Sequence, residues 1–431
     1  MGLAATAAKL GTAGVSVGAA AATTLGGCVN RRQARIEMAV GWGGVELDML
    51  RAVLRGYDHE VEVTPVGDDI DAFLRTRHRA GNLPDLAVVP RPGLVRAYAR
   101  RGWIRRLDPL ASRYPRVWNE LVEVDGGLYG VWARASHKSL FWHLPSVFDG
   151  PVPSTWAELV ELVRQLAADD GPAPLAVGAA DGWVLTDWFE NLLASRATPG
   201  LYDTLARGGP QWHHRDVRAA LADLAEIWSI PGAFPGGGQQ ALLTGYDQSV
   251  VQVASTREAV LLYEGDFVAS TAAPFLDDEG FAYFRFPSPT AELPLVVGGD
   301  VAVVADGSDA GLELADWLSG GDDAFRVWRE AGDYLSPNLD VPVGRYPAGR
   351  SRSLAQEILD QEQTLRFDLS DLLPGELNGA DGVGSWQVLQ DFFAHVAVRR
   401  PDVDAAIDEA VGSLNEMARR VTREATTEGP A

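Results

Sequence analysis

The feature that most constrains the fold is an alternation of strand-like and helix-like segments near the N-terminus. Residues 36–40 and 86–89 are short, mostly apolar runs, and residues 60–64 alternate polar with apolar side chains, which are both patterns typical of β-strands. The segments between them, 45–57 and 70–81, repeat apolar residues at helical spacing. Strands joined by single helices form a parallel sheet with right-handed crossovers. This part of the sequence therefore predicts an α/β fold.

A long extended segment follows this first lobe. Residues 128–147 read LYGVWARASHKSLFWHLPSV, come directly after Gly126-Gly127 and are rich in aromatic side chains. A proline-rich turn at 151–154 and a second alternation of strands and helices come next. With 431 residues, 46% of them hydrophobic and 22% charged, the chain is long enough for two lobes of ordinary size. We interpret 128–147 as a crossover between two lobes with a cleft beside it.

The charge balance disfavours some classes of partner. The chain carries 59 acidic against 37 basic residues, a formal net charge of −22. Such a field disfavours nucleic acid and anionic lipid surfaces as general partners, because both are themselves negatively charged. We therefore predict no nucleic-acid partner.

The first residues have the composition of an export signal. Residues 1–27 contain one basic side chain, Lys9, in a run of small and apolar residues that is short for a membrane span. Cys28, the one cysteine of the chain, follows Leu25-Gly26-Gly27. This ending resembles the lipobox of bacterial lipoproteins, which implies a lipid anchor at Cys28, followed by a polar tether over 28–35. The alternative is an ordinary secretory signal with a chance cysteine.

Catalytic and metal-binding motifs are nearly absent from the sequence. A G-x-S-x-G match at 14–18 lies inside the export signal, which makes it a chance match. The sequence contains no Walker A, G-x-G-x-x-G or H-E-x-x-H pattern. His213 and His214 are adjacent, and neighbouring side chains point in different directions in most backbones, so we predict no metal site, no cofactor and no catalytic residue. A pair of carboxylates acting as a glycosidase stays open as an alternative, because acidic residues are abundant.

Tryptophans at predicted strand ends point to a carbohydrate site. Trp42, Trp132 and Trp183 all fall in such loops, and the C–H faces of sugars stack on aromatic rings while their hydroxyls bind planar polar groups. The predicted ligand-binding residues are Trp42, Gly43, Gly44, Arg91, Trp132, Arg134, Trp183, Glu264, Asp266 and Asp300. The alternatives are that the tryptophans pack within the lobes, that the arginines are solvated, and that the glycines only make tight turns.

Several segments in order along the chain resemble one protein family. They are AGNLPD at 80–85, LDPL at 107–110, LYGV at 128–131, PSTWAEL at 153–159, VGGD at 297–300, GDYLSP at 332–337 and FDLSD at 367–371. With them the chain resembles the extracellular solute-binding proteins of bacterial ABC transporters, in the carbohydrate-binding group that includes maltose-binding protein. The resemblance spans about 36–419. It departs from the family at Trp132, where a proline is usual, at Trp142-His143, and at Phe267.

This resemblance implies a type II periplasmic-binding-protein-like fold, with two discontinuous lobes joined by a hinge and a ligand cleft between them. Lobe 1 would comprise 36–131 and 304–345, and lobe 2 would comprise 132–303 and 346–431. The implied function is capture of a sugar or oligosaccharide in the cleft, without catalysis, and its delivery to the permease subunits of the importer. The protein would act as a monomer, lipid-anchored on the extracytoplasmic face of the cell membrane. The alternatives are a secreted glycoside hydrolase and a receptor for a solute other than a sugar.

Overall fold

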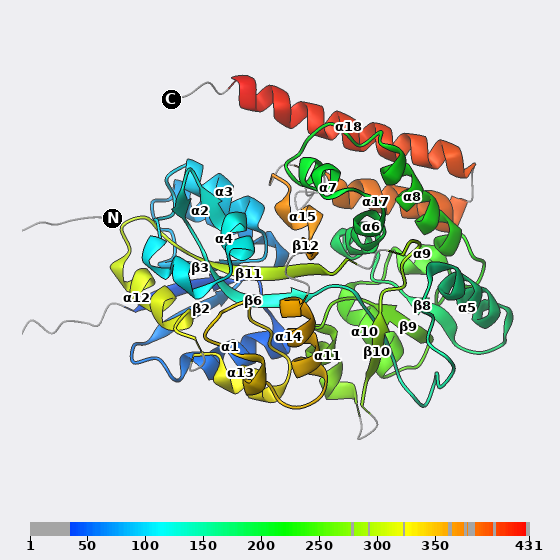
Figure 1. Ribbon diagram of the computed structural model, residues 1–431, viewed down its shortest axis with the longest axis horizontal. Coiled ribbons are helices and arrows are strands. Elements are labelled where there is room, and N and C mark those ends of the chain that lie inside the picture. The colour runs from blue at the N-terminus through cyan, green and yellow to red at the C-terminus, as the bar shows by residue number, and fades with distance from the viewer. Residues whose placement is uncertain are drawn as a thin grey trace, which may run out of the picture. The chain divides into compact units, whose positions relative to one another are not determined.

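The computed structural model describes residues 35–276, 280–291, 294–321, 324–360, 364–374, 377, 384–399 and 402–427, with no side-chain description for Asp68 and 421–427 (Figure 1). The predicted export signal at 1–27, the lipidation site Cys28 and all but the last residue of the tether at 28–35 lie outside these residues.

One sheet is built on the predicted parallel strands. Strands β1 (Ile36–Val40), β2 (Val61–Pro65) and β3 (Leu86–Val89) pair in parallel with β1 in the centre. These bounds confirm the predicted strands at 36–40 and 86–89, and place the one at 60–64 a residue later. Strand β11 (Val296–Val304) runs antiparallel beside β3 and also pairs with β6 (Val131–His137) and with β12 (Arg366–Phe367).

The second sheet has the order β10-β7-β9-β8. Its strands are β7 (Leu140–His143), β8 (Ala173–Ala176), β9 (Ala259–Tyr263) and β10 (Ala282–Arg285). A small ribbon joins β4 (Glu123–Val124) to β5 (Gly127–Leu128). Only Lys138 and Ser139 separate β6 in the first sheet from β7 in the second, so the chain changes sheets inside the predicted crossover at 128–147.

The predicted lobe boundaries do not coincide with the ends of the strands. The boundaries at 131/132 and 303/304 fall inside β6 and β11, and the chain returns from the second sheet to the first between β10 and β11. Strand β12, within the predicted second-lobe range, pairs with the first sheet. Nor do Gly298 and Gly299 interrupt β11: a Cβ on Gly299 would lie 2.6 Å from the Arg134 carbonyl oxygen, so glycine lets β6 and β11 approach closely.

Helices pack against both sheets. Around the first sheet these are α1 (Gly44–Leu54), α2 (Ile70–Arg79), α3 (Pro92–Arg100), α4 (Arg116–Val122), α12 (Asp309–Leu318) and α13 (Arg326–Ala331). The central part of the chain adds α5 (Trp156–Ala168), α6 (Gly182–Arg196), α7 (Pro199–Ala206), α8 (Arg215–Trp228), α9 (Gly238–Ala241), α10 (Tyr246–Ala254) and α11 (Val268–Ala272). The later helices are α14 (Arg350–Asp360), α15 (Leu369–Leu372), α17 (Ser385–Phe393) and α18 (Val403–Thr427).

Shorter helical turns complete the chain. Single 3-10 turns lie at Gly67–Asp69, Asp108–Arg113, Ala273–Phe275 and Val343–Arg345, and a π-helical turn lies at Ala394–Arg399. Helices α17 and α18 lie beside α6 and α8 (Figure 1). Their apolar faces join one of two buried clusters, which packs around the second sheet, whereas the other spans the first sheet and also includes residues of β7, β8 and β9.

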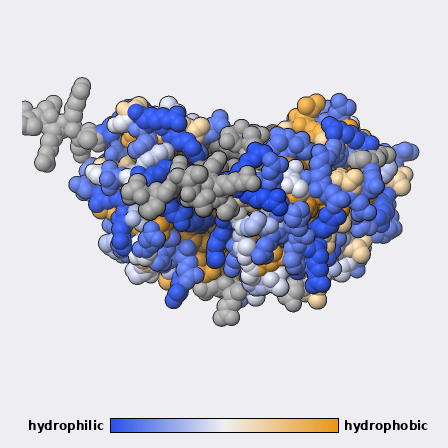
Figure 2. Space-filling view, turned by 90° about the horizontal axis from the view of Figure 1, so that it is seen from above, coloured by the Kyte–Doolittle hydropathy of each residue, from blue (hydrophilic) through white to orange (hydrophobic). Residues whose placement is uncertain are grey.

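Local sequence signals explain several of these elements. Helix α5 begins with a capping box, in which Thr155 and Glu158 each accept a hydrogen bond from the other's backbone N–H. The face that α5 buries carries Leu159 and Val163, which are one turn apart. The face of the molecule in Figure 2 is predominantly hydrophilic, in keeping with the acidic composition. Within the described ranges, no helix has the length and apolarity needed to cross a membrane.

Candidate functional site

A cavity of about 850 Å³ opens where loops from both sheets meet. On the first sheet it is lined by the residues that follow β1 and β3, by the end of β6 and by the middle of β11. The other wall comes from the starts of α6 and α10, from 267–275 and from α15, with Trp386 of α17. The carboxyl ends of parallel strands are where open α/β sheets bind ligands, and the volume is typical of a small-molecule site.

The structure brings most of the predicted site residues together in this cavity. Those that line it are Trp42, Gly43, Gly44, Arg91, Arg134, Trp183 and Asp300. Three predicted residues, Trp132, Glu264 and Asp266, do not line it.

Trp132 packs into the protein interior. Its side chain is 2% exposed, its Nε1–H donates to the carbonyl oxygen of Trp118 at 3.1 Å, and its ring meets those of Trp118 and Phe367. Its side chain therefore contributes to the packing between β6 and α4, as in the alternative in which the tryptophans pack within the lobes.

Glu264 and Asp266 are buried behind the cavity. Both follow β9, and neither is more than 4% exposed. Asp266 accepts a hydrogen bond from the His137 backbone N–H at 2.7 Å, which ties the end of β9 to β6. Burial raises the pKa of Asp266 to about 6 and that of Glu264 to about 8. These carboxyls are part of the structure at the strand ends and are too buried for a ligand to reach.

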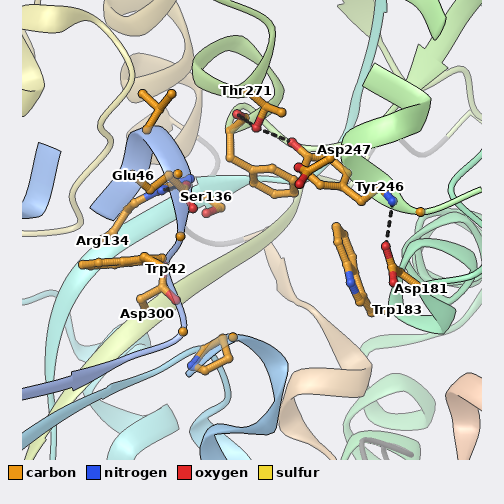
Figure 3. Close-up of a pocket in the computed structure, with 18 of the residues that line it drawn as sticks. Trp42, Glu46, Arg134, Ser136, Asp181, Trp183, Tyr246, Asp247, Thr271 and Asp300 are labelled. Carbon is orange, nitrogen blue, oxygen red and sulfur yellow. Dashed lines mark hydrogen bonds and ion pairs between the residues drawn. The ribbon is translucent and has the colours of Figure 1, made fainter. Parts of the chain in front are cut away.

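Contacts with Asp300 and Trp328 fix the position of the Trp42 side chain. Its Nε1–H donates to Asp300 Oδ2 at 3.2 Å, and its ring meets Trp328 edge to face at 5.3 Å between centroids. The Arg134 guanidinium lies 5.5 Å from the centre of the Trp328 ring and forms an ion pair with Glu46. Figure 3 shows Trp42, Glu46, Arg134 and Asp300 gathered on one side of the cavity. Arg134 is 2% exposed, and its contacts assign it first to the positioning of Trp42.

Gly43 and Gly44 connect β1 to α1. Gly44 has φ +48°, a conformation that disfavours other residues, whereas Gly43 is extended and a Cβ there would meet nothing within 4 Å. Backbone geometry therefore requires glycine at Gly44, and both residues leave the start of α1 open to the cavity.

The opposite wall is an aromatic surface edged by carboxylates. The rings of Trp183, Tyr246 and Phe267 contact one another at centroid distances of 5.3–6.1 Å. Asp181 Oδ2 accepts a hydrogen bond from the Tyr246 backbone N–H at 2.6 Å, which fixes the start of α10 against that of α6 (Figure 3). Asp247 is exposed at the cavity, and its pKa is raised by partial burial and by the charges of Asp181 and Glu46.

Lys138 lies at the base of the cavity within a group of acidic side chains. Its ammonium forms an ion pair with Asp368, and its Nζ lies 3.2 Å from Asp187 Oδ2 and 3.6 Å from Asp371 Oδ2. Burial, together with the charge of Asp368, raises the pKa of Asp371 to about 8. The cluster joins the β6–β7 connection to α6 and to α15, the segments that meet where the chain changes sheets.

Part of this cluster has the geometry of a metal site. Asp187, Glu190 and Asp368 each offer a carboxylate oxygen within 4.8 Å of the others. The Lys138 ammonium already forms ion pairs with Asp187 and Asp368. Glu190 accepts hydrogen bonds from the backbone N–H groups of Leu369 and Ser370. The cluster is therefore partnered without an ion.

Sequence reasoning missed a further group of lining residues. These are Glu46, Ser136, Lys138, Asp181, Tyr246, Asp247, Gln248, Phe267, Phe275, Asp371 and Trp386. Tyr246 and Trp386 begin helices α10 and α17 and follow no strand. The strand-end rule that found Trp42 therefore could not find them.

The sequence matches a known family and known relatives. Residues 54–322 match the family described as bacterial extracellular solute-binding protein. The osmoprotective compounds-binding protein GgtB of Synechocystis sp. is 31% identical over 387 residues, which cover 86% of this chain and 88% of that protein. The alpha-glucosides-binding periplasmic protein AglE of Rhizobium meliloti is 26% identical over 405 residues, which cover 86% of each.

The fold matches solved structures as well. The bacterial solute receptor AcbH, described as having an exclusive preference for β-D-galactopyranose, superposes with a TM-score of 0.73 at 14% sequence identity. The match covers 90% of this chain and 99% of AcbH. At this identity the likeness establishes the fold alone, and it confirms the predicted two-lobed α/β architecture.

Proposed function

We propose that this chain, which belongs to the family of bacterial extracellular solute-binding proteins, captures a sugar or a closely related polyhydroxylated solute in the cavity and delivers it to the permease subunits of an ABC importer. Family membership identifies it as the solute-binding component of such a transporter, working on the extracytoplasmic side. The identity of the solute, the delivery step and the lipid anchor are our proposals.

The observation that carries the sugar assignment is the pairing of aromatic rings with carboxylates on both walls. Trp42 lies beside Asp300 on one wall, and Trp183 with Tyr246 lies beside Asp181 on the other. Rings stack on the C–H faces of a sugar, and carboxylate oxygens accept hydrogen bonds from its hydroxyls. The relatives named for α-glucosides and for β-D-galactopyranose support the same class of solute.

Capture would proceed by closure of two lobes. A solute that touches both walls favours the closed state, because it makes more contacts there than in the open state. We propose that the lobes comprise 36–131 with 304–345 and 132–303 with 346–431, and that they meet along β6 and β11. The matched family and the relatives above are binding proteins, and we propose binding without catalysis for this chain.

A thermal-shift screen tests the solute class. Mono- and disaccharides, polyols and short peptides are added to the purified protein, and we expect a shift with at least one sugar. A ligand present at 100 times its Kd stabilises the protein by about 2.7 kcal/mol. Chromatography of the same mixtures should show no new products. Shifts with peptides alone would contradict the sugar assignment, and turnover of a glycoside would favour the glycosidase alternative.

Fractionation tests the lipid anchor. Cys28→Ala removes the one residue that a thioether-linked lipid could occupy, so we expect the protein to move from the membrane fraction to the soluble fraction in its bacterial host. The wild-type chain is the control. Retention of the variant in the membrane fraction would show that another segment holds it there.

A further inference from the structure

Three buried N–H donors on two neighbouring side chains, one from each wall of the cavity, have no acceptor. They are Nε and Nη1 of Arg91 and Nε1 of Trp386. Both side chains line the cavity, Arg91 is 2% exposed, and its guanidinium lies 5.6 Å from the centre of the Trp386 ring. A buried donor without an acceptor costs about 1–3 kcal/mol, so such donors rarely persist unless something else satisfies them. Three on neighbouring side chains indicate a place for an oxygen-bearing group.

The charge of Arg91 is also left without a close counterion. Among the described residues, no carboxylate forms an ion pair with Arg91, although its charge acts on Asp371, whose carboxylate lies 3.6 Å from the Lys138 ammonium. Burial and the charge of Asp368 raise the pKa of Asp371 to about 8, which weakens this carboxyl as a counterion for the guanidinium. Lys138, the other cation nearby, is already neutralised by Asp368 and Asp187. A buried cation in this position favours an anion.

The rest of the cavity has the opposite character. Glu46 and Asp300 on one wall, and Asp181 and Asp247 on the other, offer carboxylate oxygens beside Trp42, Trp183 and Tyr246 (Figure 3). These groups accept hydrogen bonds and repel anions, so they suit the hydroxyls and C–H faces of an uncharged sugar ring. The cavity is therefore rich in acceptors near these carboxylates and has unsatisfied donors at Arg91 and Trp386.

We infer that the solute is a glycoside that carries a carboxylate, with its sugar ring against Trp183 and the acidic wall and its carboxylate against Arg91 and Trp386. The planar guanidinium fork binds a carboxylate through two parallel hydrogen bonds, and the indole N–H supplies a third donor. This inference rests on the proposed function, since it narrows the class of sugar that the same cavity takes.

Calorimetric titration with matched disaccharide derivatives tests it. Maltobionate with maltitol, lactobionate with lactitol, and cellobionate with cellobiitol each differ by a carboxylate in place of one CH₂OH group. In at least one pair we expect the acid to bind at least tenfold more tightly than the alcohol. The affinity of the acid should fall as salt is added, and that of the alcohol should not.

Variants locate the carboxylate within the cavity. Arg91→Gln should remove the advantage of the acid over the alcohol, whereas Arg100→Gln, at an exposed position on α3 outside the cavity, should leave it unchanged. Trp386→Phe keeps a ring and removes the N–H, and it should reduce the advantage by a smaller factor. Because Trp386→Phe alters no charge, it tests the same contact if Arg91→Gln fails to fold.

The outcomes separate this inference from the function beneath it. The inferred carboxylate is overturned if the alcohol binds as tightly as the acid, or more tightly, in every pair that binds. It is also overturned if Arg91→Gln and Arg100→Gln lose the advantage of the acid equally. Either result leaves the sugar site intact. If neither the acids, nor the alcohols, nor any sugar in the thermal-shift screen binds, the proposed function itself is overturned.

Discussion

Replacing Lys138 with methionine is expected to lower the free energy of unfolding by about 3–5 kcal/mol, the usual cost of removing one partner from a buried ion pair. The Lys138 side chain is 12% exposed, and its ammonium interacts with Asp187, Asp368 and Asp371. Burial alone would raise the pKa of Asp368, and the charge of Lys138 together with hydrogen bonds to the carboxylate holds that pKa at about 2. Without the ammonium, the protein must either keep an uncompensated carboxylate in its interior or bind a proton there.

Urea denaturation followed by circular dichroism at neutral pH measures this loss. Arg116→Met is the matched control, because its ion pair with Glu120 is exposed and screened by solvent and should contribute far less. Adding Asp368→Asn to Lys138→Met should recover part of the stability, since the amide removes the carboxylate that is paired most closely with the ammonium. A loss below about 1 kcal/mol for Lys138→Met would contradict a structural role for this cluster.

Replacing Trp183 with alanine is expected to weaken sugar binding by roughly thirtyfold, which corresponds to about 2 kcal/mol, the scale of a central aromatic anchor in a binding site. Trp183 lines the cavity and packs against Tyr246 and Phe267, so its loss removes stacking surface and loosens the two rings beside it. Trp183→Phe retains a ring and should retain part of the affinity. Trp317 of α12 is also partly buried but lies outside the cavity, and Trp317→Ala is the matched control.

The fold followed from local patterns because those patterns have direct physical causes. Strict alternation at 60–64 and apolar runs at 36–40 and 86–89 reflect the two faces of a strand, and they gave β1 to β3 to within a residue. Gly298 and Gly299, which lie within β11, show the limit of such patterns. Glycine often ends a strand, yet here it allows β11 to lie against β6 without a clash.

The site was most predictable where its residues follow strands. Trp42 and Arg91 were found because strand ends of one sheet face the same edge, whereas Asp300, also predicted, lies inside β11. Tyr246 and Trp386 begin helices far along the chain, and only tertiary packing brings them to the cavity.

For two further residues, the sequence does not reveal where the side chain lies. Trp132 follows the loop rule and is still a packing residue, because a ring at a strand end can turn to either face. Lys138 carried a signal in its rarity, as Lys9 and Lys138 are the lysines of a chain that otherwise uses arginine. Only the structure shows that the Lys138 ammonium lies among several buried carboxylates.

The central claim, that this cavity is the sugar site, is tested most directly by calorimetric titration of the best sugar from the screen into the wild-type protein, Trp183→Ala and Trp317→Ala. We predict one saturable site per chain in the wild type, binding weakened roughly thirtyfold in Trp183→Ala, and unchanged binding in Trp317→Ala. Wild-type affinity in Trp183→Ala would contradict the claim, because a sugar in the cavity must lie against that ring.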